Sequence, residues 1–381
     1  MRNLFRIICL LIMILLPITA NAFLLRVGLK NGVSGIVVSA TSYFDLIDMH
    51  TNQVILTTYG WRNYKIDVEN GGLAVEGVGT FQGPIILAPI SNAFGKVDNK
   101  AYRGKLEISR TNNARIMVVN IIDIEEYLYG VVGSEMSSSF PLEALKAQAI
   151  IARTFALAGL KKHQDKGYNL CSTTCCQAYN GALAESLIIT TAVDQTQSLV
   201  LSYGGNLAKT YYHSCCGGKT APFIWKGQGE PYLQSKNCPF CNHLRNSSYS
   251  WTQRISFYEL QKAFGTDKIT SISINAQDES GRAKTILICQ VSGNTTIDAN
   301  KFRSTMGYTR VKSTLFTMDN DGQGVVLNGN GYGHGVGLCQ WGARGMAEAG
   351  YTFKEILGFY YPGVCLQKIA FEKKMRGRQD E

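Results

Sequence analysis

Residues 131–155 read VVGSEMSSSFPLEALKAQAIIARTF, and the rest of the chain is organised around this stretch. A polar loop is expected from Ser134 to Ser139, and it holds a single carboxylate, Glu135. Pro141 follows at a position suited to the first turn of a helix. From Leu142 onward, apolar residues recur at three- and four-residue steps, which predicts a helix. The sequence therefore predicts an acidic loop that leads directly into a helix.

Two cations belong to the same predicted helix. Lys146 and Arg153 are seven residues apart, so they project from nearly the same side. An exposed helix stripe is the ordinary explanation for such a pair. The helix is otherwise rich in alanine and apolar residues, which suggests burial, and a buried arginine needs a partner. We therefore favour a functional role for both cations, either in holding acetamido sugars or in balancing charge at the site.

This stretch resembles the signature of the SpoIID (stage II sporulation protein D) family, also called the amidase-enhancer family. The matching segments are EM at 135–136, FPLEALKAQA at 140–149 and ART at 152–154, with Ser137 where the family usually has proline. Two further blocks also match, YHSCCGGKT at 212–220 and GNGYGHGVGLCQWGA at 329–343. The resemblance covers most of the chain after about residue 115.

The resemblance implies a lytic transglycosylase that cuts the glycan strands of peptidoglycan, with Glu135 as the catalytic acid. Breaking a glycosidic bond needs a proton on the leaving oxygen, and a hydrolase normally adds a second carboxylate. A lytic transglycosylase can work with one, because the same group can then help the sugar's own hydroxyl to attack. Glu143 lies within the predicted helix, where it suits the helix dipole. The alternative for Glu135 is a carboxylate that caps the helix.

The resemblance also places the glycine-rich loop with His334 in the substrate cleft, and Gln340 with it. The structural alternative is a packed loop whose glycines permit a tight turn. A nucleophilic pair of Cys339 and His334 is conceivable. We disfavour it, because the geometry across a glycine loop is not assured and family members commonly carry serine at this position.

Ten cysteines follow the first 22 residues. Some family members hold zinc with one histidine and two cysteines, and the nearest residues here are His163, Cys171 and Cys176. Cys175 and Cys216 are alternative ligands. Such a zinc would be structural, and no cofactor is expected for catalysis. A disulfide among Cys171, Cys175, Cys176, Cys215 and Cys216 is an equal alternative, and Cys238-x-x-Cys241 suits either a disulfide or a metal site.

The first 22 residues have the pattern of a signal peptide, with Arg2 and Arg6, an apolar run and the small-residue site Ala20-Asn21-Ala22. An uncleaved anchor is the alternative. The formal net charge of +10 predicts acidic partners, and cell-wall polymer fits an exported protein better than nucleic acid. We expect a periplasmic or extracellular protein that does not span the membrane once the signal is removed.

The predicted fold is α+β, with a mixed, β-rich core, a central catalytic helix and a smaller β subdomain at the N-terminus. The expected division is a signal peptide (1–22), an N-terminal β subdomain (23–95), a SpoIID-like catalytic domain (96–366) and a basic tail (367–381). A short helix is expected over 121–129, where Asp123, Glu125 and Glu126 would form a solvated face.

The leading hypothesis is an exported lytic transglycosylase that acts on peptide-stripped glycan strands and leaves 1,6-anhydro-muramic ends. Stripped strands imply a partner amidase. One rival is a non-enzymatic wall-binding protein that enhances an N-acetylmuramoyl-L-alanine amidase. A second rival is a metallohydrolase built on the cysteine and histidine region.

Overall fold

The computed structural model describes residues 23–225, 228–242 and 248–370. The predicted signal peptide, and the basic tail from residue 371 onward, lie outside the described residues. The fold is mixed α+β, as predicted, and two hydrophobic cores organise it. Within the described residues, no helix is both long and apolar enough to cross a membrane.

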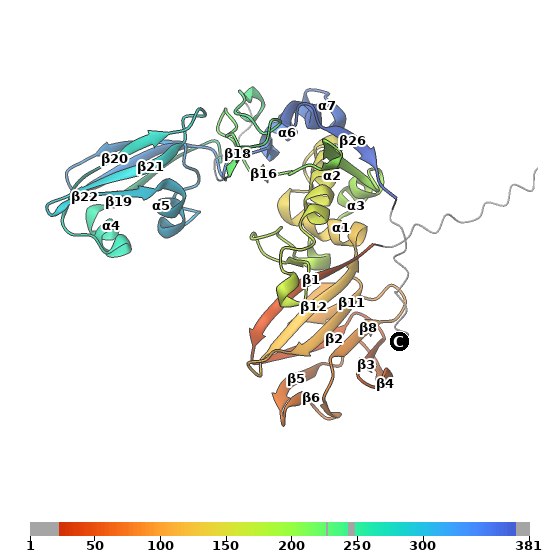
Figure 1. The fold of residues 1–381 in the computed structure, drawn as a ribbon. Coiled ribbons are helices and arrows are strands. Elements are labelled where there is room, and N and C mark those ends of the chain that lie inside the picture. The colour runs from red at the N-terminus through yellow and green to blue at the C-terminus, as the bar shows by residue number, and fades with distance from the viewer. Residues whose placement is uncertain (1–22, 226–227, 243–247, 371–381) are drawn as a thin grey trace, which may run out of the picture.

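The N-terminal third of the chain forms two sheets that share the larger core (Figure 1). The alternation of buried and exposed side chains along these strands places one face of each sheet against that core. The first sheet has the order β13 (Leu170–Cys171), β1 (Leu24–Val33), β12 (Ile116–Asp123), β11 (Lys105–Arg110), β8 (Ile85–Pro89), β3 (Phe44–Asp48) and β4 (Gln53–Thr58). The second has the order β10 (Lys100–Tyr102), β9 (Gly95–Val97), β2 (Gly35–Ala40), β5 (Tyr64–Glu69), β6 (Gly72–Val75) and β7 (Gly79–Phe81).

Pairing between β1 and β12 runs across the predicted boundary at residue 95. Leu24 pairs with Asp123 and Val33 pairs with Ile116, so the first and last strands of this region are neighbours. The division at residues 95 and 96 therefore stays a prediction about folding units, and the sheet itself continues through it.

A helical layer sits above these sheets and shares their core (Figure 1). Its central member, α2, is almost fully buried, as its alanine-rich sequence predicted, and it contacts α1, α3, α6 and α7. The helices are α1 (Ile124–Glu135), α2 (Leu142–Ala158), α3 (Leu187–Asp194), α6 (Gln340–Glu348) and α7 (Phe353–Tyr360), with 3-10 turns η1 (Gln164–Lys166), η2 (Gly181–Ala184) and η3 (Pro239–Cys241).

Short strands tie distant parts of the chain to this layer. Strand β16 (Tyr212–His213) pairs in parallel with β25 (Leu338–Cys339), which joins the second and third sequence blocks. The remaining short strands are β14 (Leu199–Tyr203), β15 (Asn206–Leu207), β26 (Cys365–Lys368), β17 (Ile224–Trp225) and β18 (Gln228–Gly229), and β14 pairs with both β15 and β26.

Residues 250–330 form a separate module with its own core, drawn apart from the rest in Figure 1. The chain enters at Ser250 and leaves at Asn330, which are paired residues. The module contains β19 (Ser250–Ser256), α4 (Phe257–Phe264), β20 (Ile269–Gln277), β21 (Ala283–Gln290), β22 (Gly293–Asp298), α5 (Ala299–Met306), β23 (Phe316–Asn320) and β24 (Gly324–Asn330).

Candidate active site

Glu135 is the last residue of α1, and not part of a loop as the sequence had suggested. The helix begins at its N-cap Asp123, whose carboxylate accepts a hydrogen bond from the Glu125 amide. Two glycines near the C-terminal end of α1 made this part of the helix hard to predict from the sequence. A Cβ on Gly130 would lie 2.5 Å from the Tyr179 ring, and one on Gly133 would lie 1.9 Å from the Ala184 carbonyl oxygen. These glycines therefore serve close packing inside a helix.

The Glu135 carboxylate is half-buried and anchored through one oxygen. The backbone amide of Ala178 donates to Glu135 Oε1 at 2.8 Å, and the Tyr212 hydroxyl donates to the same oxygen at 3.2 Å. The other oxygen, Oε2, accepts no hydrogen bond from the described residues. The carboxylate thus has one fixed oxygen and one that remains for a ligand.

A hydrogen-bond network holds Tyr212 in place behind the carboxylate. Gln177 Nε2 donates to the Tyr212 hydroxyl at 3.2 Å and to the Ala152 carbonyl on α2 at 3.3 Å. The Tyr127 hydroxyl donates to Gln177 Oε1 at 3.4 Å. The Tyr212 hydroxyl accepts from Gln177, so its own proton points to Glu135. Tyr212 belongs to the second matching block, at 212–220, but neither it nor Gln177 had an assigned role, because their distance from Glu135 depends on the fold.

Burial is the largest influence on the pKa of the Glu135 carboxyl group. Desolvation raises its pKa above the ordinary value for glutamate, while the hydrogen bonds from Ala178 and Tyr212 act in the opposite direction. A carboxyl with a raised pKa stays protonated to a higher pH, which suits a general acid. Burial also raises the pKa of Tyr212 well above its usual range, so this residue remains a donor.

Lys146 is engaged by a neighbour on its own helix. Its Nζ donates to Glu143 Oε1 at 2.7 Å and lies 5.8 Å from the centre of the Phe353 ring. Glu143 also accepts from the Phe353 amide, at the first residue of α7. Although desolvation raises the pKa of Glu143, the hydrogen bond from Lys146 and its other interactions outweigh this effect, so the pKa is lowered. Glu143 therefore remains ionised and joins α2 to α7.

Arg153 does not occupy the position expected of a substrate-binding residue. Its side chain is 0% exposed, and it forms a bidentate ion pair with Glu125, with Nε 3.0 Å from Oε1 and Nη2 2.5 Å from Oε2. A further guanidinium bond goes to the Leu199 carbonyl. The expectation of a solvated acidic face also fails for Glu125, which is 8% exposed. Arg153 fastens α2 to α1 and, in this position, cannot reach a ligand.

The third sequence block divides between surface and core. His334 is exposed, and its ring centre lies 5.5 Å from that of His213, the residue after Tyr212. Gln340 is buried, and its Nε2 lies 3.5 Å from Gln148 Oε1 on α2. His334 is therefore available to a ligand, whereas Gln340 joins α6 to α2. Cys339 is buried among other cysteines, which disfavours a nucleophilic role.

One predicted metal-binding group comes together as expected. The ligand atoms of His163, Cys171, Cys175 and Cys176 all lie within 4.8 Å of one another. His163 Nε2 is 3.4 Å from Cys176 Sγ and 3.8 Å from Cys175 Sγ. No disulfide joins the described cysteines, and the cluster can hold a metal ion. Cys216, the other alternative ligand, belongs to a different cluster, because it follows β16 on another part of the core.

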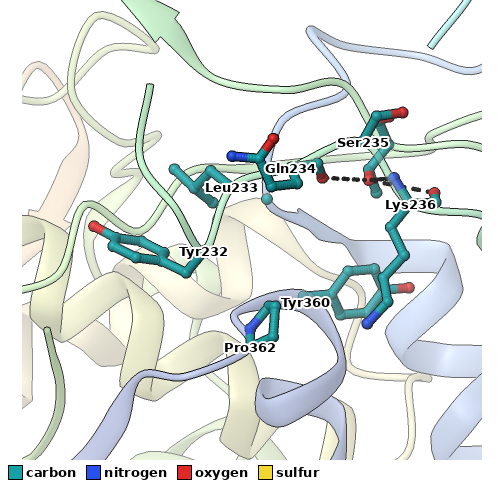
Figure 2. A pocket seen from close by; sticks show the side chains of 9 residues that line it. Tyr232, Leu233, Gln234, Ser235, Lys236, Tyr360 and Pro362 are labelled. Atoms are coloured by element: carbon teal, nitrogen blue, oxygen red, sulfur yellow. Dashed lines mark hydrogen bonds between the residues drawn. The ribbon is translucent and has the colours of Figure 1, made fainter. Parts of the chain in front are cut away.

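A pocket of about 110 Å³ lies elsewhere on the same layer (Figure 2). Figure 2 shows Gln234, Ser235 and Lys236 on one side, and Tyr360 and Pro362 below them. The lining contains no carboxylate, and Lys236 Nζ is bonded to the Phe359 carbonyl at 2.7 Å. The pocket therefore does not coincide with the Glu135 site.

Fold and site together define a mixed α+β protein with one half-buried carboxylate at a helix end, backed by a tyrosine and a nearby cysteine cluster. The chain belongs to the SpoIID family. The family model for Stage II sporulation protein matches residues 112–203, which include Glu135, Gln177 and the first cysteine cluster. A model for a Domain of unknown function (DUF8618) matches residues 239–337, which include the separate module.

Several curated proteins are similar to most of the chain. An uncharacterized protein of Brachyspira hyodysenteriae is 36% identical over 330 residues, with 84% of each chain covered. Stage II sporulation protein D of Bacillus subtilis is 30% identical over 74% of this chain and 84% of its own length. The amidase enhancer of Bacillus subtilis is 31% identical over 80% of this chain, which spans 50% of that longer protein. These relatives support a function connected with the cell wall.

Proposed function

We propose that this protein is a lytic transglycosylase that cleaves peptidoglycan glycan strands with Glu135 as general acid and base. The observation that carries the proposal is the asymmetry of this carboxyl group. Burial raises its pKa, Oε1 is held by Ala178 and Tyr212, and Oε2 is left for a ligand. A hydrolase of the usual kind would need a second carboxylate across the scissile bond. The neighbouring Glu143 is not a candidate for this second group, since it is bonded to Lys146 and to α7.

The reaction follows from the two states of this carboxyl group. Protonated Glu135 donates through Oε2 to the glycosidic oxygen, and the bond from that oxygen to the anomeric carbon breaks. The resulting carboxylate then accepts the proton of the muramic acid 6-hydroxyl, whose oxygen bonds to the anomeric carbon. The products are a new hydroxyl end and a 1,6-anhydro ring. The amide of Ala178 and the hydroxyl of Tyr212 stabilise the ionised form between the two steps.

The proposed substrate, partner and cellular location are inferred from the family to which the chain belongs. Peptide-stripped strands are the proposed substrate, which implies an N-acetylmuramoyl-L-alanine amidase as a partner. The relative named amidase enhancer supports this link. We also propose that the protein acts in the periplasm or outside the cell, where its peptidoglycan substrate would lie, with residues 1–22 as its signal peptide. His334 and Lys146 remain the proposed substrate contacts, because His334 is exposed and Lys146 is half-buried near the surface.

The first cysteine cluster fits a structural zinc ion, for which His163, Cys171, Cys175 and Cys176 supply the donors. Imidazole and thiolate ligands in tetrahedral number suit zinc, and a closed set leaves no position for a catalytic water. Cys176 directly precedes Gln177 and Ala178, the two residues that reach the Tyr212 and Glu135 side chains. The cluster would therefore hold this segment against the carboxylate.

The test is mass spectrometry of the products released from amidase-treated glycan strands. We expect strands that end in 1,6-anhydro-N-acetylmuramic acid. Products with reducing ends alone would make the protein a hydrolase. Glu135→Gln should abolish release, because glutamine cannot donate the acid's proton, and loss of general acid catalysis costs about 10²–10⁴-fold in rate.

Glu143→Gln is the matched control, because it changes a carboxylate that is bonded to Lys146 and α7 and does not touch Glu135. It should leave most of the cleavage intact. The non-enzymatic rival gives a different pattern: folded wild-type protein would release nothing from stripped strands, and Glu135→Gln would still enhance an amidase.

A further inference from the structure

Four cysteines from three distant segments meet in a second cluster. Cys216 follows β16, and Cys339 is the N-cap of α6. Cys238 is the N-cap of η3, and Cys241 is its last residue. Their Sγ atoms all lie within 4.8 Å of one another, and all four residues are buried. In the sequence, the only local sign of this group is the spacing Cys238-x-x-Cys241.

The spacing of the sulfur atoms fits ligands of one metal ion. Cys216 Sγ and Cys241 Sγ are 3.5 Å apart. Four thiolates around zinc, each about 2.3 Å from the ion in a tetrahedron, stand roughly 3.8 Å from one another. A disulfide would bring a pair to about 2.0 Å. An iron–sulfur cluster distributes four cysteines over two or four irons, which spreads the sulfur atoms more widely than a single ion does.

The backbone around Cys339 favours a thiolate. The amides of Cys216 and Gly342 each donate to Cys339 Sγ at 3.2 Å, and the second of these lies in the first turn of α6. The N-terminus of a helix favours negative charge. Gly342 also permits the close approach, because a Cβ there would lie 2.8 Å from Cys238 Sγ. The Tyr360 hydroxyl adds a contact to Cys238 Sγ at 3.2 Å.

A buried arginine lies next to the cluster, which is compatible with negative charge there. Arg282 is 2% exposed, and its guanidinium donates to the carbonyls of Cys216 at 2.7 Å and Lys219 at 2.9 Å. It forms no ion pair with a carboxylate of the described residues. Its Nη1 also donates to the Ser280 hydroxyl at 3.0 Å, and that hydroxyl is bonded to the Asp278 carboxylate. A buried cation needs an anionic counterpart, and a zinc ion with four thiolates carries a net charge of −2.

We propose that Cys216, Cys238, Cys241 and Cys339 bind a second, structural zinc ion. The ion links the second and third sequence blocks, because Cys216 follows β16 and Cys339 lies in β25, the strand paired with β16. Arg282 brings the separate module to the same centre. The site stands on its own geometry and does not depend on the proposed cleavage reaction.

Native mass spectrometry of the purified full-length chain tests the site, together with metal analysis. We expect two zinc ions per chain and no disulfide among the cysteines of the described residues. Cys238→Ser with Cys241→Ser should reduce the content to one, as should Cys171→Ser with Cys176→Ser, and the four substitutions together should remove both. The matched control is Cys289→Ser with Cys365→Ser, two cysteines outside both clusters, which should retain two ions.

Cobalt substitution supplies a readout on the wild-type chain, should the serine variants fail to fold. A site with four thiolates gives intense sulfur-to-cobalt charge-transfer bands, and a site with histidine gives weaker ones. The proposal is overturned by a wild-type mass that shows disulfides in place of the second ion. It is equally overturned by a single zinc that Cys238→Ser with Cys241→Ser leaves bound, or by iron at the second site.

Discussion

The Tyr212 hydroxyl donates to Glu135 Oε1 at 3.2 Å, although the two residues belong to different sequence blocks. This bond makes the acidity of the carboxyl depend on the position of a strand. Burial raises the pKa of Glu135, and the Tyr212 bond partly offsets that rise. Strand β16 carries Tyr212 and is held by β25, so the third block contributes to the site without touching Glu135.

Tyr212→Phe should shift the pH dependence of cleavage to higher pH. Loss of the bond removes an interaction that lowers the Glu135 pKa, so the carboxyl remains protonated to a higher pH. The expected stability cost is about 1 kcal/mol, as for a typical hydrogen bond. The measurement is the pH profile of kcat on stripped strands. Tyr129→Phe is the matched control, because its hydroxyl bonds Asp194, and its profile should be unchanged. A pH profile of kcat that is not shifted in Tyr212→Phe would contradict the role of this hydrogen bond.

Glu135→Gln should increase stability at neutral pH. The pKa of Glu135 is higher in the folded state than in the unfolded chain. As the pH rises, the unfolded chain therefore ionises first. The wild-type protein loses stability between the unfolded-state pKa and the folded-state pKa. The glutamine variant has no such loss. The two proteins should unfold alike at acidic pH, and the variant should gain about 0.5–2 kcal/mol at neutral pH, the usual range of stabilising substitutions. Denaturant titrations across this pH range measure the difference; a gap that closes with rising pH would refute the argument.

Arg153→Met should destabilise the protein by about 3–5 kcal/mol, because it leaves the Glu125 carboxylate buried and unpaired. Adding Glu125→Gln should restore much of the loss, since the unpaired charge is removed. A double-mutant cycle from urea unfolding measures the coupling. The same substitution at Arg103, whose bidentate pair with Glu185 is partly exposed, is the matched control and should cost far less. Equal costs at both sites would show that burial of the Arg153 pair is unimportant.

His163→Ala should release one metal ion and reduce cleavage together. The first cluster lies directly before Gln177 and Ala178, so its loss frees the segment that donates to Glu135. Metal analysis and product release on the same preparation provide the two measurements. His50→Ala is the control, because this exposed residue is outside both cysteine clusters. If the ion is lost while cleavage remains normal, the cluster does not position this segment.

Secondary-structure elements could be predicted where the capping residues and the apolar spacing lie within one short segment of the sequence. The helices Phe353–Tyr360 and Phe257–Phe264 can be read from the sequence, because each has a capping box and apolar spacing within adjacent residues. The start of α5 is harder to read, because strand β22 runs to Asp298 and the helix follows it directly at Ala299.

Long-range contacts account for what the sequence could not show. The end of α1 was predicted to be a loop, because the reason for Gly130 and Gly133 is their close packing against Tyr179 and Ala184, which are distant in the sequence. The burial of Arg153 was foreseen from its alanine-rich helix, but its partner Glu125 was assigned to a solvated face. The four sulfurs of the second cluster meet only after three distant segments fold.

The two-residue pairing of β16 with β25 also sets an order of events during biosynthesis. The chain emerges from its N-terminus, and folding follows emergence. Glu135 and Tyr212 become available early, yet β16 has no partner strand until Leu338 and Cys339 have appeared. The site therefore reaches its final geometry only when nearly the whole polypeptide has been made. A product that ends before Leu338 and Cys339 would lack the strand that holds β16, and so the support that positions Tyr212 beside Glu135.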